Sequence, residues 1–260
     1  MRGIYQPSGE AGEYSRWAVN LYDGCGHGCG YCYVPSILRM DAAVWASRIG
    51  KRREGILRQL ERDVVKLARM EPGADVLMCF TSDPYGPGET STTREAIRIL
   101  GEAGLRPVIL TKSGGRAVRD FDLLLEHGGS FGTSLVWSTS DAKRIEWEPY
   151  AASVDERMLV IAQAKNYGLH TWVSLEPVID PVEALGVIEM MHGLVDHWKV
   201  GKINAKGRWA PEVMEKVKRI ERETDWRAFA VDVLQLLTKL NANFYMKNSL
   251  SKYLHERAPR

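Results

Sequence analysis

Short apolar runs alternate with longer amphipathic stretches along most of this chain. The runs are rich in β-branched or aromatic side chains, which is typical of strands buried in a sheet. The strands that this pattern predicts are residues 17–22, 75–80, 106–111, 130–136, 170–175, 197–203 and, as a short seventh strand, 243–246.

Between these runs, apolar side chains recur every three to four residues, as on the buried face of a helix. Two of the stretches open with a capping box, Thr92-x-x-Glu95 and Ser153-x-x-Glu156, which satisfies free backbone N–H groups at a helix start. The predicted helices are a long one over 41–69 that is broken near Gly50 and Gly55, one after Thr92, one over 116–127, one from Ser153 to Gly168, one over 181–192, and several after Pro211.

The alternation of strand and helix repeats about six times with short connections. Strands that alternate with helices pair in parallel through right-handed crossovers. Since a closed TIM barrel needs eight strands, the pattern predicts an α/β fold of the partial (β/α)6 TIM-barrel type, with an extra C-terminal helix and strand. We expect one domain over residues 1–260, with an N-terminal extension (1–15) and a C-terminal helical extension (205–260).

Charge and composition narrow the class of protein. The chain has 35 Lys and Arg against 33 Asp and Glu, a formal net charge of +2, which excludes a strongly basic nucleic-acid coat protein and an acidic solvating tail. No apolar run approaches the ~18–20 residues that cross a bilayer, and the polar N-terminus carries no secretory signal. We therefore expect a soluble, cytoplasmic protein with no membrane contact.

Three of the four cysteines form a tight cluster. Cys25, Cys29 and Cys32 lie in one Gly-rich loop after the first strand, whereas Cys79 lies far downstream. A secreted disulfide scaffold is shorter and richer in cysteine. A [4Fe–4S] cluster usually takes four thiolates, so three would leave one iron open, as in catalytic metal sites.

Polar side chains recur where the predicted strands end. In parallel β/α folds the reactive groups gather at the carboxyl ends of the strands. Besides the cysteine loop, the residues at these ends are Thr81, Ser82, Asp83, Lys112, Ser113, Ser134, Ser138, Glu176 and Asn204. We expect them to face one rim of the sheet.

Four short segments of the chain, taken together, carry a recognisable sequence pattern. The first is Cys25-x3-Cys29-x-Tyr31-Cys32, and the others are 80–89 (Phe-Thr-Ser-Asp-Pro-Tyr-Gly-Pro-Gly-Glu), 109–113 (Ile-Leu-Thr-Lys-Ser), and 148–149 (Glu-Pro) with 155–157 (Asp-Glu-Arg). The set resembles the radical S-adenosylmethionine (SAM) superfamily, in the branch that contains spore photoproduct lyase, over roughly residues 17–180.

The resemblance implies a radical enzyme. Its cofactors would be a [4Fe–4S] cluster on Cys25, Cys29 and Cys32, and SAM on the open iron. One electron from a reductant such as flavodoxin or ferredoxin would cleave SAM to a 5′-deoxyadenosyl radical, which abstracts hydrogen from a substrate. The substrate that the branch favours is a nucleic-acid base or nucleotide, with a small metabolite or a peptide as alternatives.

The same likeness assigns SAM contacts to residues at the strand ends. The expected contacts are Tyr33 on the adenine side, Ser82 and Asp83 at the ammonium group, Lys112 at the carboxylate, and Ser134 at the ribose or carboxylate. Glu176 is expected to touch SAM or the substrate.

One position departs from the photoproduct lyases, which carry a hydrogen-donor cysteine just before their Thr-Ser-Asp. Here that position is Phe80, and Cys79 stands one residue earlier. A shift of one residue turns a strand side chain to the opposite face. We therefore expect Cys79 to point away from SAM as a buried apolar filler, and we do not expect thymine-dimer repair by the same route.

An alternative stays open on the sequence alone. The cysteines could belong to a non-enzymatic metal module, with zinc or an iron–sulfur cluster, that acts in nucleic-acid binding or electron transfer. Zinc sites usually pair two short Cys-x2–4-Cys hairpins, which this chain lacks. Of the remaining polar residues, His27 is expected to be a solvated loop side chain, and the basic run from Arg48 to Arg58 a solvated helix face.

Overall fold

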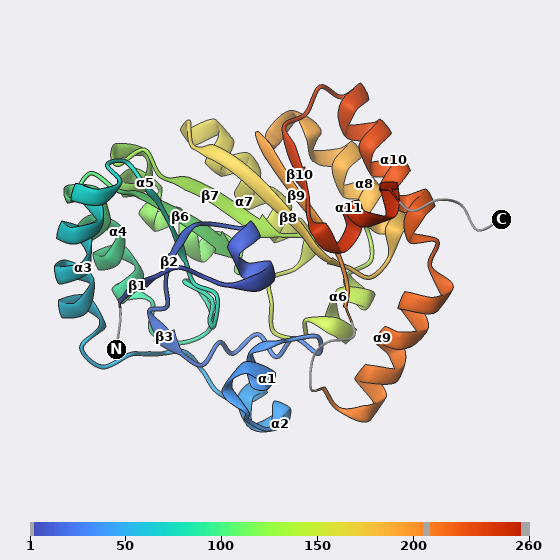
Figure 1. The fold of residues 1–260 in the computed structure, drawn as a ribbon, viewed down its shortest axis with the longest axis horizontal. Coiled ribbons are helices and arrows are strands. Elements are labelled where there is room, and N and C mark those ends of the chain that lie inside the picture. The colour runs from blue at the N-terminus through green and yellow to red at the C-terminus, as the bar shows by residue number, and fades with distance from the viewer. Residues whose placement is uncertain (1–2, 205–208, 256–260) are drawn as a thin grey trace.

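The computed structural model describes residues 3–204 and 209–255, and it is built around one eight-stranded sheet (Figure 1). The strand order is β1-β2-β5-β6-β7-β8-β9-β10. Every pair from β2 to β10 is parallel, and only β1 runs antiparallel, to β2. The strands are β1 (Ile4–Tyr5), β2 (Trp17–Val19), β5 (Asp75–Met78), β6 (Arg106–Thr111), β7 (Ser130–Ser134), β8 (His170–Val178), β9 (His197–Lys202) and β10 (Phe244–Met246).

Helices follow most of the strands, and several pack on the outside of the sheet (Figure 1). They are α1 (Val34–Leu38), α2 (Ala42–Ala46), α3 (Ile56–Met70), α4 (Ser91–Glu102), α5 (Phe121–Glu126), α6 (Asp141–Trp147), α7 (Val154–Tyr167), α8 (Pro181–Met191), α9 (Pro211–Glu223), α10 (Trp226–Lys239) and α11 (Asn248–His255). The 3-10 helices are η1 (Gly9–Glu13), η2 (Gly115–Asp120) and η3 (His192–Leu194). In the described residues no pairing joins β1 to β10, so the predicted partial barrel is confirmed.

The predicted long helix over 41–69 is wrong in its first half. The chain forms the short helix α2, then a strand β4 (Lys51–Arg52) that pairs with β3 (Tyr22–Asp23), and only then α3. Gly50 and Gly55 mark these breaks, since Gly50 lies directly before β4 and Gly55 takes the left-handed conformation (φ +67°) at the start of α3.

Of the two predicted capping boxes, one is confirmed and one is wrong. The Ser153 hydroxyl accepts from the Glu156 N–H, and the Glu156 carboxylate accepts from the Ser153 N–H. At the other site α4 starts at Ser91, and Glu89 accepts from the Thr92 N–H instead. At α4 the acidic partner therefore precedes the helix, where its carboxylate accepts from a free N–H group of the first turn.

Strand ends were predicted within a few residues. β8 runs on to Val178, so Glu176 lies inside the strand rather than after it, and β1 was not predicted at all. Ala18, Leu77 and Trp172 form a small buried cluster on the inner side of the sheet, apart from the main core between sheet and helices. No helix in the described residues combines the length and the apolar character that crossing a bilayer requires.

Candidate active site

A cavity of about 620 Å³ opens at the carboxyl ends of the parallel strands. The side chains of Ser82, Asp83, Lys112, Ser134 and Glu176 all line it, and so do Thr81 and Asn204. The prediction that the strand-end residues share one rim is confirmed for these. The reason is topological, because the seven parallel strands present their carboxyl ends to the same side.

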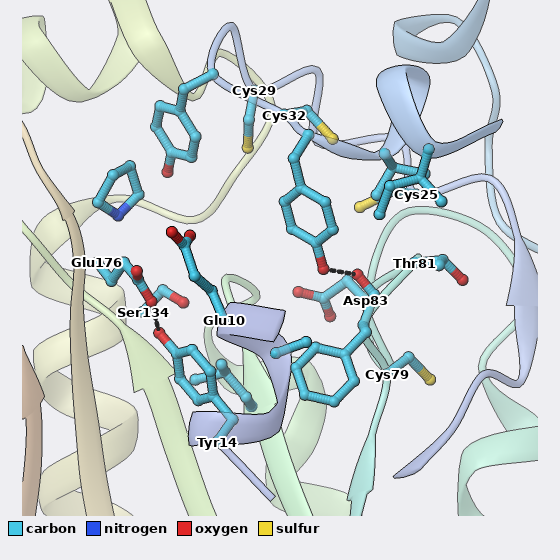
Figure 2. A pocket seen from close by; sticks show the side chains of 18 of the residues that line it. Glu10, Tyr14, Cys25, Cys29, Cys32, Cys79, Thr81, Asp83, Ser134 and Glu176 are labelled. Atoms are coloured by element: carbon cyan, nitrogen blue, oxygen red, sulfur yellow. Dashed lines mark hydrogen bonds between the residues drawn. The ribbon is translucent and has the colours of Figure 1, made fainter. Parts of the chain in front are cut away.

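The three clustered cysteines form the opposite wall of this cavity. Cys25, Cys29 and Cys32 line it from the loop between β3 and α1, and Figure 2 shows them across the cavity from Tyr14, Ser134 and Glu176. Backbone close to the loop explains some of its glycines: a Cβ on Gly24 (φ +91°) would lie 2.7 Å from the Ile49 carbonyl oxygen. Close backbone contacts therefore restrict which residues the loop can carry between its cysteines.

Burial dominates the electrostatics of the cysteine loop. Burial raises the pKa of the Cys29 thiol to about 12, with Lys112 opposing the effect and Glu148 adding to it. Burial also raises the pKa values of Cys25 and Cys32. Three thiolates so close together need a compensating positive charge, which iron ions provide.

The cysteines do not surround a single point. Within residues 3–204 and 209–255, no three His, Cys, Asp or Glu side chains are gathered closely enough to hold one metal ion. A tetrahedral zinc ion requires such convergence.

His27, between the first two cysteines, is buried and not solvated, so the prediction for it was wrong. Its side chain is 3% exposed, and Nε2 lies 3.0 Å from Asp83 Oδ2. The other ring nitrogen, Nδ1, lies 3.3 Å from the Tyr150 carbonyl oxygen. The imidazole is thus enclosed between the end of β5 and the segment that follows α6.

Asp83 is surrounded by donors. Its Oδ1 accepts from the Tyr85 N–H (2.8 Å) and the Thr111 hydroxyl (2.6 Å), and its Oδ2 accepts from the Lys112 N–H (2.7 Å) and faces His27. Burial acts to raise its pKa, but the contact with His27 and these hydrogen bonds prevail and lower the pKa to about 2. Asp83 is therefore ionised at neutral pH, with both oxygens engaged by protein groups.

A second buried carboxylate holds the other end of the loop. The Tyr31 hydroxyl donates to Glu148 Oε1, and Glu148 Oε2 lies 2.5 Å from the Arg157 guanidinium. Arg157, which is fully buried, also donates to the carbonyl oxygens of Ser134 (2.9 Å) and Ala152 (2.9 Å). Burial opposes ionisation of Glu148, yet Arg157 and Lys112 keep its pKa below the ordinary value.

Lys112 and Tyr33 lie on the cavity side, as expected. Lys112 Nζ stands 5.8 Å from the centre of the Tyr31 ring and makes no ion pair with any described carboxylate within 4.0 Å. The Tyr33 side chain is 43% exposed, and its hydroxyl donates to the Phe80 carbonyl oxygen at 2.6 Å. Lys112 is thus a basic side chain in the cavity wall without an ion-pair partner among the described residues.

Glu176 belongs to a network that the sequence did not reveal. Lys247, just after β10, donates to both Glu176 oxygens (2.9 and 2.7 Å), and the Tyr14 hydroxyl donates to Oε2 (Figure 2). The Tyr14 hydroxyl also forms a hydrogen bond with the Ser174 hydroxyl (2.7 Å). Burial raises the pKa of Glu176, although Lys247 favours its charged form. No local pattern marks Tyr14 or Lys247, because their partners lie far away in sequence.

Cys79 is buried, as predicted, although it is still among the residues that line the cavity. It is 8% exposed, belongs to the main hydrophobic core, and its sulfur accepts from the Leu21 N–H at 3.5 Å. In Figure 2 its side chain points away from the three clustered cysteines. The next residue, Phe80, instead packs edge-on against the Tyr14 ring, with the ring centres 6.1 Å apart.

The comparison with protein families decides which family the chain belongs to. Residues 19–192 match the family described as the Radical SAM superfamily, which is more than half of the chain. The chain belongs to the radical SAM superfamily. The resemblance drawn from the sequence is thereby confirmed, as is the expectation that this protein is an enzyme.

The chain is also similar to a curated protein and to several solved structures. An uncharacterized protein of Acidianus two-tailed virus, ORF301, is 29% identical over 171 residues, which are 64% of this chain and 56% of the viral protein. The chain thus spans little more than half the length of that relative.

The solved structures show the same fold at low identity. A mutant of spore photoproduct lyase matches with a TM-score of 0.67 and 13% identity, over 93% of this chain and 78% of that one. Spore photoproduct lyase complexed with dinucleoside spore photoproduct gives 0.64 and 15%, over 93% and 80%. SuiB of Streptococcus suis bound to S-adenosylmethionine gives 0.65 and 12%, over 93% and 53%.

Proposed function

We propose that this radical SAM protein holds a [4Fe–4S] cluster on Cys25, Cys29 and Cys32 and cleaves SAM reductively in the cavity. The observation that carries the proposal is the placement of three thiols on one loop, facing a cavity lined by polar strand ends. When bound, such a cluster supplies one electron to SAM, whose S–C5′ bond then breaks to give methionine and a 5′-deoxyadenosyl radical.

The side chains of this chain would bind and orient SAM. Lys112, which has no carboxylate partner among the described residues, pairs with the SAM carboxylate. Tyr33 borders the adenine side, and Ser134 the ribose or carboxylate. Ser82 meets the ammonium group, and the negative charge of Asp83 favours a cation there even though both of its oxygens are already engaged.

The proposed substrate is a nucleic-acid base or nucleotide, and the proposed electron donor is a flavodoxin or ferredoxin. Support for the substrate class comes from the shared fold with spore photoproduct lyase, which has been seen with a dinucleoside spore photoproduct. The reaction differs from cysteine-dependent repair, because Phe80 replaces the donor cysteine and the Cys79 side chain points away from the three clustered cysteines. Glu176 faces the space left for the substrate or SAM.

Anaerobic reconstitution tests the proposal directly. The wild-type chain, loaded with iron and sulfide and reduced with dithionite, should convert SAM to 5′-deoxyadenosine and methionine, measured by liquid chromatography. Cys29→Ala should abolish both the brown colour and the turnover, whereas Cys79→Ala should retain both. Bound zinc without iron or sulfide in the wild type would instead support the non-enzymatic metal module.

A further inference from the structure

The side chain between the first two cysteines connects the cluster loop to the SAM side of the cavity. We propose that His27 is a positioning residue that clamps the cluster loop onto Asp83, and that Asp83 serves SAM binding through this clamp rather than by a direct hydrogen bond. The inference rests on the proposed function, since it concerns how the same cluster and SAM are held.

The first step of the argument is the burial of His27. Its side chain is 3% exposed although it sits in a loop, and both ring nitrogens lie within hydrogen-bonding distance of an oxygen. The backbone adds a third tie, because the Tyr150 N–H donates to the His27 carbonyl oxygen at 3.2 Å. A loop side chain enclosed in this way fixes the conformation of the loop and cannot reach out to bind substrate.

The second step is the acceptor capacity of Asp83. An ionised carboxylate offers about four lone-pair sites. The Tyr85 N–H, the Thr111 hydroxyl and the Lys112 N–H take three of them, and His27 lies 3.0 Å from Oδ2 as the fourth partner. The side chain is 7% exposed. A ligand ammonium would therefore have to displace a protein donor before it could bond this carboxylate.

The third step is what the clamp joins. The groups that contact Asp83 come from the turn after β5, from the end of β6, and from the cluster loop. Lys112, the proposed partner of the SAM carboxylate, is one of them through its backbone N–H. Asp83 thus fixes the cluster loop relative to the residue that would hold the amino-acid part of SAM. A displacement of the cluster loop would therefore also displace Lys112.

The test compares SAM affinity among variants of the reconstituted enzyme. His27→Ala removes the clamp, and Asp83→Asn turns one acceptor into an amide donor that conflicts with the surrounding N–H groups. Each should keep the wild-type iron content but weaken SAM binding by about 10-fold to 100-fold, the usual effect of losing a group that orients a metal site. The electron paramagnetic resonance signal of the reduced cluster should respond less to added SAM.

Three further variants make the test specific. The double variant should bind SAM no more weakly than either single variant, because both changes break one contact. His27→Gln, which offers a side-chain N–H at similar reach, should recover most of the affinity. Glu183→Gln is the matched control, since this buried carboxylate also accepts several hydrogen bonds but lies beside Ser138 and Thr139; it should leave SAM binding unchanged.

The outcomes separate the two proposals. A wild-type protein that takes up no iron or does not bind SAM overturns the proposed function itself. If the wild type binds both, weaker SAM binding in Asp83→Asn with wild-type affinity in His27→Ala would show a direct Asp83 contact and overturn the clamp. Wild-type SAM affinity in both single variants would overturn it as well.

Discussion

At the scale of single residues, buried carboxylates and their partners shape this cavity. Asp83, Glu148 and Glu176 lie around the cavity or the cluster loop. Each of these carboxylates lies against a buried basic side chain. The matching is required, because a buried charge without a partner costs several kcal/mol. Substitution of one partner of such a pair should therefore change the free energy of unfolding.

The Glu148–Arg157 pair gives the clearest stability prediction. Arg157→Met leaves Glu148 buried without its cation, and the free energy of unfolding should fall by about 3–5 kcal/mol. Urea denaturation of the iron-free protein measures this. Arg106→Met, which removes an exposed Arg partner of Asp75, should cost less than about 1 kcal/mol. Equal losses in the two variants would contradict the importance of burial.

Glu183 on α8 gives a prediction for pH. Burial tends to raise its pKa, but hydrogen bonds from Ser138 and Thr139 lower the pKa to about 2. Since the folded pKa is below the unfolded one, the stabilisation is present above about pH 4.5 and is lost as the pH falls towards 2.

The variant Glu183→Gln measures this contribution. It should be less stable than wild type by roughly 1.5–3 kcal/mol at pH 7, and the difference should shrink steadily between pH 4.5 and pH 2. Urea denaturation across this range provides the values. Glu189→Gln, at an exposed position of the same helix, should show no such trend, and a difference independent of pH for Glu183→Gln would refute the assignment.

At the scale of elements, the N-terminal segment is part of the cavity and not an appendage. Residues 8–14, which include η1, cross the middle of the sheet in Figure 1 and contribute Ser8, Glu10 and Tyr14 to the cavity lining. Lys199 on β9 holds the segment by donating to the carbonyl oxygens of Tyr14 (2.6 Å) and Glu13 (3.3 Å). The segment therefore depends on side chains of distant strands for its position.

Limited proteolysis tests this dependence. Lys199→Met should speed cleavage after Glu10 and Glu13 by a glutamate-specific protease, because two backbone acceptors lose their donor and the segment opens more often. Mass spectrometry of the fragments gives the rates. Lys239→Met, on the exposed end of α10, is the matched control. Unchanged cleavage in Lys199→Met would mean that the other contacts of the segment suffice.

At the scale of the whole molecule, we expect that the fold does not depend on the three clustered thiols. A large continuous core lies between the sheet and its helices, and the clustered cysteines are only partly buried and lie outside it. The loop also contacts the C-terminal part of the chain, since the Trp209 indole N–H donates to the Cys32 carbonyl oxygen at 2.9 Å. That contact uses backbone and does not need the thiol.

The variant with Cys25, Cys29 and Cys32 all changed to Ala should consequently fold. Its thermal midpoint should stay within about 4 °C of the iron-free wild type, about the shift that 1 kcal/mol produces in a domain of this size. Differential scanning calorimetry compares the two proteins. Loss of the cooperative transition in the triple variant would show that the thiols themselves stabilise the apo fold.

The sequence by itself determined the alternation of strands and helices in the parallel sheet and the position of the cluster loop. Apolar runs and cysteine spacing are local properties of the chain, so they can be interpreted without knowing which distant residues pack nearby. Even the shared rim of Ser82, Lys112 and Glu176 followed from them, because parallel strands must end on one side.

Only the tertiary structure decided the partners of these residues. His27 resembles any solvated loop histidine until Asp83 and Tyr150 enclose it, and Tyr14 gains its role only where Glu176 and Lys247 meet it. Those partners lie tens to more than a hundred residues away. The burial and hydrogen bonds of a polar side chain depend on which distant segments pack around it, and no local pattern encodes that.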